Sequence, residues 1–231
     1  MNGILLIDKP SGWTSFDVVN YVRKMVASRE GKKPKHVKVG HTGTLDPLAT
    51  GLLVILIGSY TKQAARLSKS DKTYEVIMEL GRNSTTGDAE GITTRISTKR
   101  PTPGQVKQAL DHFTGKILQT PPAFSAIKVN GQRAYKLARA GRPVQLAPRP
   151  VEIYHSVLSD YDYPSVGFTL TVSSGTYIRS LVEDIGAYLT TGAYLTGLRR
   201  LQVGKFSVTD AVKPQAIDLD RDCKNEPCST G

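Results

Sequence analysis

A run of six consecutive apolar residues, 52–57, is the feature that most constrains how this chain can fold. A run without polar alternation predicts a strand that is buried on both faces. Directly before it, residues 41–47 read H-T-G-T-L-D-P. Gly43 permits a tight turn, and Pro47 biases Asp46 towards an extended conformation. The sequence therefore predicts one carboxylate, Asp46, on a loop that a buried strand anchors, and catalytic residues often stand on such loops.

The chain is also strongly basic. Lys and Arg outnumber Asp and Glu by 31 to 20, which gives a net charge of +11. This balance favours a polyanionic partner, most often nucleic acid, over a generically basic protein. The charges cluster as well: residues 23–38 hold seven Lys and Arg and one acid, and no acid lies between Asp111 and Glu152. The second of these windows suits an excursion that closes over a phosphate backbone.

Other classes of protein find little support. Cys223 and Cys228 lie near the end of the chain, so they build no disulfide framework, and without a nearby His they are a weak metal signal. We find no metal-ligand cluster, no phosphate-binding glycine loop and no nucleophilic Ser or Cys with a His partner. No charged-then-apolar leader opens the chain, and its longest apolar run is far short of a membrane span. We therefore expect a cytoplasmic protein that needs no metal, no cofactor and no membrane.

The hydrophobic periodicity predicts an α+β fold, because strands and helices mix without regular βαβ alternation. A capping box at Thr102 opens one helix, and Phe16 begins the helical spacing of another. Strands are expected near residues 3–8, 52–57, 72–80, 125–129, 151–158, 166–172 and 194–206, and helices near 15–26, 60–68, 103–113, 134–140 and 177–189. Residues 81–101 are expected to be irregular. We expect one domain over residues 1–213 and a frayed polar tail over 214–231.

Five segments carry recognisable motifs. They are G-I-L-L-I-D-K-P-S-G-W-T-S at 3–15, G-H-T-G-T-L-D-P-L-A-T-G-L-L at 40–53, K-T-Y at 72–74, T-P-P-A-F-S-A-I-K-V-N-G-Q-R-A-Y at 120–135 and S-G-T-Y-I-R at 174–179. Together, and in this order, they resemble the signatures of the TruB family, the tRNA pseudouridine-55 synthases. The resemblance spans the chain to about residue 210. It implies the pseudouridine-synthase fold, with a central mixed, largely antiparallel sheet flanked by helices and a thumb-like insertion at about 122–150.

The resemblance implies an activity. The enzyme would isomerise uridine 55 in the T-loop of tRNA to pseudouridine by detaching the base from C1′, rotating it and rejoining it through C5. No redox change occurs, which fits the lack of any cofactor motif. A uridine inside a folded loop is inaccessible, so the nucleotide must be flipped out at a cost of roughly a few kcal/mol. Whether the carboxylate attacks C1′, adds to the uracil ring or supports proton transfer stays open.

Three residues match the catalytic positions of the family. Asp46 stands at its catalytic aspartate, Tyr74 at the tyrosine that stacks on the target base, and Arg179 at the arginine that pairs with the aspartate. From the residues alone, Asp46 is more often a turn residue, Tyr74 a core aromatic and Arg179 a phosphate contact or a surface cation. Asp88 also lies in a family-like segment, although a turn explains it adequately.

Further residues match positions that bind substrate. His41 corresponds to a histidine associated with base flipping, and Tyr177 and Leu198 correspond to walls of the pocket. Their plainer interpretations are a hydrogen-bonding residue at a turn for His41 and core packing for the other two. Candidate contacts to the RNA backbone lie in the insertion: Lys128, Arg133, Lys136, Arg139 and Arg142.

The chain departs from the family pattern at its end. Many members carry a C-terminal RNA-binding domain of the PUA type, and the roughly twenty residues after Thr209 are too few to build one. We expect a short form or a sequence that ends early, acting as a monomer on the T-arm of tRNA without an obligatory protein partner or guide RNA. Two alternatives remain: an RNA-binding or RNA-folding module without catalysis, and a guide-RNA-dependent relative that works inside a ribonucleoprotein.

Overall fold

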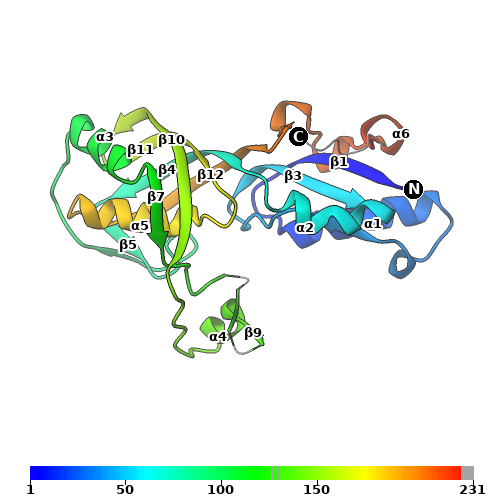
Figure 1. Cartoon of the computed structure of the whole chain (residues 1–231), viewed down its shortest axis with the longest axis horizontal. Helices are drawn as coiled ribbons and strands as arrows, with labels where there is room; N and C mark the ends of the chain where they lie inside the picture. Colours follow the sequence, from blue (N-terminus) through cyan, green and yellow to red (C-terminus); the bar gives the residue numbers. More distant parts are fainter. Residues whose placement is uncertain (126, 130, 225–231) are drawn as a thin grey trace. The chain divides into compact units, whose positions relative to one another are not determined.

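The computed structural model describes residues 1–125, 127–129 and 131–224, and its elements are drawn in Figure 1. The chain divides into two compact units, Met1–Tyr74 with Leu198–Gly231, and Glu75–Gly197. Strands β4 (Lys72–Leu80) and β12 (Ala193–Val203) each contribute residues to both units. None of the helices in the described part of the chain is long and apolar enough to cross a membrane.

The first unit is built on the predicted buried strand, which is β3 (Thr50–Ile57). It pairs antiparallel with β1 (Gly3–Lys9) and β2 (Val39–His41), and parallel with the last part of β12. Every residue of β3 after Thr50 is buried, as its apolar run predicts. A buried core cluster comprises Ile4, Leu6, Leu52, Val54, Leu56 and Val203. The 3₁₀ turns η1 (Pro34–His36) and η2 (Gly58–Gln63) and the short helix α2 (Ala64–Leu67) complete this part of the chain.

Helix α1 (Ser15–Arg29) begins at a capping box. The Asp17 amide donates to the Thr14 hydroxyl (3.1 Å), and the Asp17 carboxylate accepts the Thr14 amide (2.8 Å). The box satisfies backbone groups that a helix leaves unpaired at its start. Its buried face is formed by Val18, Val19, Val22 and Val26. Phe16 fits the helical spacing but is 61% exposed, so including it in the apolar stripe was wrong.

In the second unit the strand order is β12-β4-β11-β10-β7. Strand β10 (Arg149–Asp162) pairs antiparallel with β11 (Ser165–Val172) and with β7 (Gly115–Gln119). Helices α3 (Pro103–His112) and α5 (Ile178–Tyr188) belong to the same unit. The mixed, largely antiparallel pairing and its accompanying helices confirm the predicted α+β class.

Several short elements differ from the predictions. We expected residues 81–101 to be irregular, but they contain the hairpin of β5 (Arg82–Ser84) and β6 (Thr93–Arg95). Strand β7 was not predicted either. Strands of three to five residues show too few repeats for periodicity to reveal them. The insertion contains β8 (Lys128–Val129), β9 (Gln132–Arg133) and α4 (Ala134–Arg139). Among the described residues, the strand expected near 125–129 is limited to β8, and residues 126 and 130 lie outside the described part of the chain.

The expectation of a frayed tail is wrong for residues 214–224. After β13 (Phe206–Ser207) and the turn η3 (Val208–Asp210), the chain forms η4 (Pro214–Ala216) and helix α6 (Leu219–Asp222). The Ile4 amide donates to the Lys224 carbonyl (3.0 Å), and the Lys224 amide donates to the Ile4 carbonyl (2.9 Å). This segment is therefore ordered by pairing with β1, which its local composition does not reveal. Cys228 lies outside the described residues.

Candidate active site

The loop that carries Asp46 joins β2 to β3, and neighbouring side chains hold its backbone on both sides of the aspartate. At the start of α1, the buried Ser15 hydroxyl accepts from the Leu45 amide (2.8 Å) and lies 3.0 Å from the Leu45 carbonyl. On the other side, the Lys9 ammonium donates to the Pro47 carbonyl (3.2 Å). The Ala49 amide donates to the carbonyl of Asp46 itself (3.1 Å). The half-buried Asp46 carboxylate thus stands on a backbone fixed at three points.

Lys9 is fully buried, and it joins two loops of the first unit. Besides Pro47, its ammonium donates to the carbonyls of Pro10 (2.9 Å) and Trp13 (2.5 Å). The Gly12 amide also donates to the Pro47 carbonyl (2.9 Å). A buried charge is tolerated when several hydrogen bonds satisfy it, as they do here. Lys9 therefore ties the turn after β1 to the Asp46 loop.

A second buried cation, Arg200, holds the same loop from β12. Its side chain is 1% exposed, and it donates from Nε to the Leu52 carbonyl (2.7 Å) and from Nη2 to the Gly43 carbonyl (3.0 Å). Its backbone runs so close to Gly51, where φ is +95°, that a Cβ there would lie 2.3 Å from the Arg200 carbonyl oxygen. Glycine is thus required where β12 passes β3. Nothing in the local sequence distinguishes Arg200 from an exposed basic residue of a strand.

Burial and the charge of Arg200 perturb two neighbouring bases. Burial, and then the charge of Arg200, lower the pKa of His41 below its usual 6.5, so that His41 is neutral at pH 7. Its Nδ1 accepts a hydrogen bond from the Gly43 amide (3.2 Å). Burial and Arg200 also lower the pKa of Lys72 to about 8, and the Lys72 ammonium donates to the carbonyls of Ser68 (2.8 Å) and Ser70. The Asp46 loop therefore lies against a concentration of positive charge.

The remaining predicted residues of the first unit are Tyr74 and Leu198. Tyr74 is 7% exposed and lies on the buried face of β4, as the alternation predicts. Leu198, in β12, is half-buried, and its carbonyl lies 3.5 Å from the Thr50 hydroxyl at the start of β3. Packing of the core alone would explain both positions, so the predicted contacts of Tyr74 and Leu198 with the substrate stay predictions.

Arg179 lies in the first turn of α5, in the second unit, and is buried. Its guanidinium donates to the carbonyls of Thr86 (3.1 Å) and Phe124 (2.9 Å), and its Nε lies 3.7 Å from the Asp88 carboxylate. Asp88 is buried too, and accepts from the Thr86 hydroxyl (2.5 Å) and the Glu90 amide (3.1 Å). Asp88 is thus more than a turn residue, because it neutralises a buried arginine.

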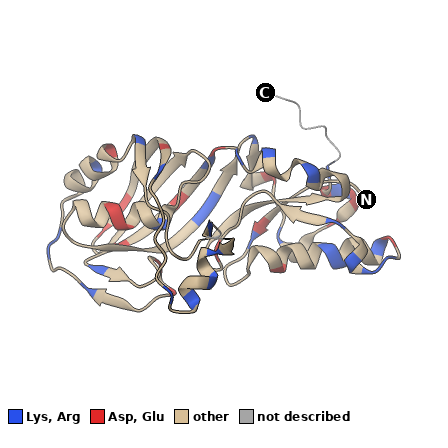
Figure 2. Cartoon of the chain, turned by 60° about the horizontal axis from the view of Figure 1, so that its bottom comes forward, with Lys and Arg blue, Asp and Glu red and all other residues tan. Residues whose placement is uncertain are grey.

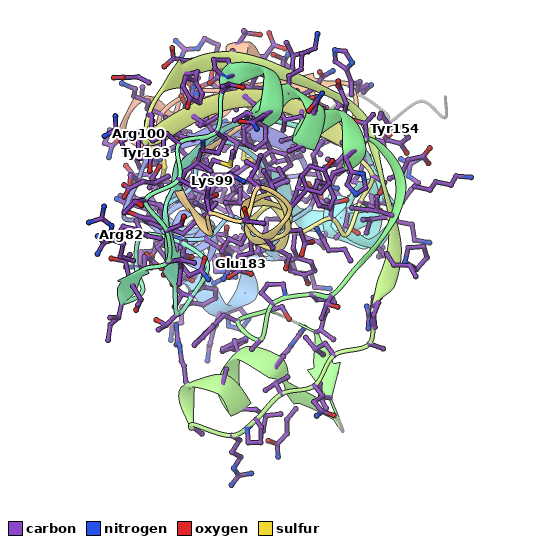
Figure 3. The ribbon with its side chains drawn as sticks, turned by 90° about the vertical axis from the view of Figure 1, so that its left-hand side faces the viewer. Arg82, Lys99, Arg100, Tyr154, Tyr163 and Glu183 are labelled. Atoms are coloured by element: carbon purple, nitrogen blue, oxygen red, sulfur yellow. The ribbon has the colours of Figure 1, made fainter. Side chains whose placement is uncertain are left out.

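Two other polar side chains of the second unit belong to α5 or bond to the residue before it. The buried Gln119 amide pairs with both backbone groups of Tyr177, accepting from its N–H (2.8 Å) and donating to its carbonyl (3.1 Å). Glu183 extends from α5 (Figure 3), and a Cβ on Gly87 would lie 2.9 Å from its carboxylate. Burial, and then the charge of Asp184, raise the pKa of Glu183. Gln119 was missed because a buried amide has no local sequence signature.

The five basic residues predicted to contact the RNA backbone are all exposed. They are Lys128, Arg133, Lys136, Arg139 and Arg142. Arg139 lies over the Tyr135 ring, 5.7 Å from its centroid. Their exposure is compatible with contact to a phosphate backbone, and this contact stays a prediction. In the described part of the chain, no three His, Cys, Asp or Glu side chains are grouped to hold a metal ion.

Comparisons with known proteins define the class of protein to which this chain belongs. Residues 29–178 match the profile of the TruB family pseudouridylate synthase N-terminal domain, and residues 179–221 match the tRNA pseudouridylate synthase B C-terminal domain. A solved Cbf5-Nop10-Gar1 complex contains a similar chain, with a TM-score of 0.67 and 28% identity over 89% of this chain and 50% of that one. A second similar chain is in an H/ACA RNP bound to a substrate RNA containing 2′-deoxyuridine, with a TM-score of 0.67 and 25% identity over 92% of this chain and 51% of that one. This chain spans about half the length of those two chains. The family match and the shared fold show that it is an enzyme of the pseudouridine synthase class.

Curated relatives narrow the assignment. The chain is 43% identical over 223 residues to tRNA pseudouridine synthase B of Thermobifida fusca, covering 91% of this chain and 72% of that protein. It is 43% identical over 226 residues to the Cupriavidus metallidurans protein of the same name, covering 96% and 69%. The chain belongs to the TruB family, which confirms the resemblance seen in its motifs.

Proposed function

We propose that this chain converts uridine 55 in the T-loop of tRNA to pseudouridine. The observation that carries the proposal is the 43% identity, over 91% of the chain, to a protein named tRNA pseudouridine synthase B. The choice of the T-loop uridine rests on the resemblance of residues 40–53 and 174–179 to the family motifs. The basic, exposed face of the insertion supports a polyanionic substrate.

The reaction is an isomerisation in which atoms and electrons balance within the substrate. The N1–C1′ bond breaks and a C5–C1′ bond forms, while C5 loses its proton and N1 gains one. The enzyme must therefore hold a flipped base, turn it after cleavage and provide for the transfer of one proton. Rigid placement of the participating groups lowers the barrier of such a reaction by several kcal/mol, because their orientation is fixed before the reaction begins.

We propose Asp46 as the catalytic carboxylate. Its support is the way the first unit holds the loop: Ser15 fixes the residue before it, Lys9 the residue after it, and Arg200 the turn at Gly43. Three buried side chains that fix one short loop indicate that its position matters. The role of the carboxylate in the chemical step stays open among attack on C1′, addition to the ring and support of proton transfer.

The other residues take supporting roles in this proposal. The ring of Tyr74 stacks on the target base, and Arg179 pairs with the catalytic carboxylate, as the family resemblance implies. His41 helps to extrude the nucleotide, and a neutral imidazole suits this task because it can both donate and accept hydrogen bonds. Tyr177 and Leu198 form walls of the pocket.

The test uses the purified chain and a tRNA transcript labelled with tritium at C5 of uridine. Because the C5–H bond breaks, each turnover releases one tritium to solvent. We expect release without any guide RNA or protein partner, and no release from a transcript in which uridine 55 is replaced by cytidine. Equal release from both transcripts would refute the T-loop assignment. Binding without release would favour an RNA-folding module, and release that requires an added guide RNA would favour the ribonucleoprotein alternative.

A further inference from the structure

A hollow of about 510 Å³ lies in the first unit, where α1, η1 and β2 meet. Four of its residues are cations and none is acidic. We call it the α1 groove, and it is lined by Asn20, Arg23, Lys24, Pro34, Lys35, Val37, Lys38, Val39, Gly40 and Thr61. Figure 2 shows Lys and Arg gathered along α1 and the loop that follows it. None of the residues proposed for catalysis lines this groove.

The lysines that line the α1 groove are not neutralised by acidic side chains among the described residues. Elsewhere in this basic segment, Arg29 pairs with Asp220, and Lys32 pairs with Glu30 (2.9 Å). The groove lysines are exposed, and no ion pair joins them to an acid of the described chain: Lys24, Lys35 and Lys38. Unneutralised cations of one sign around a hollow suit an anionic ligand.

One cation of the groove is held in place in the absence of a ligand. Arg23 donates to the Asn20 side chain (2.5 Å) and to the Val39 carbonyl (3.3 Å). These two bonds fix a planar guanidinium at the wall of the hollow, so less side-chain entropy is lost when it binds an oxyanion. A fixed arginine beside exposed lysines is a combination that suits phosphate groups.

Aromatic side chains border the groove. An adjoining hollow of about 490 Å³ shares Asn20 and Lys24 with it and is lined also by Gly12, Trp13, Asp17 and Tyr21. The rings of Trp13 and Tyr21 meet edge to face, with centroids 5.7 Å apart. Aromatic rings beside cations are typical of surfaces that bind nucleic acid, and they favour RNA over an acidic protein segment.

The groove and the Asp46 loop lie at opposite ends of β3 in the first unit. Gly40 belongs to the lining of the groove, and the next residue, His41, begins the stretch that leads to Asp46. Strand β2 pairs with Leu56 and Ile57, whereas the Asp46 loop leads into β3 at Thr50, so at about 3.3 Å for each strand residue the two lie roughly 20 Å apart along β3. We propose that the α1 groove binds backbone phosphates of the substrate RNA several nucleotides away from the target nucleotide. This inference rests on the proposed function, because it takes the target to be a nucleotide at Asp46.

The test compares two triple variants that each remove three positive charges. The groove variant carries Lys24→Gln, Lys35→Gln and Lys38→Gln. The control carries Lys69→Gln, Lys107→Gln and Lys213→Gln, three exposed lysines outside the groove lining. Affinity for a T-arm RNA is measured by fluorescence anisotropy from 50 to 400 mM KCl. Circular dichroism verifies that both variants are folded, and all six positions are on the surface.

We expect the groove variant to lose about 2 to 3 units of slope in the plot of log affinity against log salt, since each phosphate contact contributes roughly 0.7 to 0.9. At 0.1 M salt this corresponds to a loss of affinity on the order of a hundredfold. The control variant should lose much less of the salt slope and much less affinity. Equal losses in the two variants would show that net charge alone matters and would overturn the inference. The binding assay needs no turnover. An inactive chain would therefore refute the proposed function, whereas the inference about the groove would still be tested by binding.

Discussion

Replacing Arg200 with methionine tests whether this buried cation holds the Asp46 loop. The substitution keeps the length and the apolar part of the side chain and removes the guanidinium. Two backbone carbonyls, those of Gly43 and Leu52, lose a charged donor at 3.0 and 2.7 Å. Because both bonds join β12 to the Asp46 loop and its following strand, their loss affects stability and the loop together.

The size of the effect follows from these contacts. A hydrogen bond to a charged group contributes about 1.5 to 3 kcal/mol, so two such bonds contribute about 3 to 6 kcal/mol. Part of this is offset because removing Arg200 relieves its repulsion of Lys72, whose pKa it helps to lower to about 8. We expect a net loss near the lower limit, about 3 kcal/mol in the free energy of unfolding.

The matched control is Arg199→Met, on the neighbouring position of the same strand. Arg199 makes two hydrogen bonds of 2.9 Å to Asp8, but the two side chains are 37% and 21% exposed. A pair so open to solvent contributes about 1 kcal/mol or less. Urea unfolding of both variants gives the two free energies, and tritium release gives kcat. The reasoning is refuted if Arg200→Met costs no more stability than Arg199→Met, or if it leaves kcat unchanged.

Three further predictions concern buried polar groups. Ser15→Ala removes the hydroxyl that accepts from the Leu45 amide, and we expect a loss of about 1 to 3 kcal/mol in urea unfolding together with a fall in kcat; an unchanged kcat would contradict it. Gln119→Leu leaves both backbone groups of Tyr177 without this partner, and thermal unfolding should show a similar loss, which an unaltered melting temperature would refute. The pKa of Lys72 is about 8 in the folded protein and 10.5 when unperturbed, so between these values the unfolded chain binds more protons. Stability relative to Lys72→Met should therefore rise from pH 8 to pH 10, and a constant difference would contradict the lowered pKa.

Much of the fold could be predicted because its signals are local. The apolar run at 52–57 became β3, and the alternation over 72–80 became β4 with the predicted bounds. The capping box at Thr102, with Gln105 three residues later, opens α3 as expected. In each case the residues that decide the structure are neighbours in the sequence. Periodicity and capping therefore carry the information.

The support of the site could not be predicted, because it depends on contacts between distant segments. Lys9, Arg200 and Gln119 bond to backbone groups 38 to 157 residues away, and nothing in their sequence surroundings distinguishes them from exposed polar residues. The ion pair of Arg179 with Asp88 was missed for the same reason. The motif residues themselves were found because a family resemblance identifies them without geometry.

The measurement that tests the central claim most directly is tritium release by Asp46→Asn, compared with Asp111→Asn, which changes an exposed aspartate of α3 in the same way. Both variants should fold and bind the T-arm RNA with the affinity of the unmutated chain. We expect Asp46→Asn to lose at least about a hundredfold in rate, and Asp111→Asn to lose none. Release by Asp46→Asn at the rate of its control would contradict the assignment of Asp46 as the catalytic carboxylate.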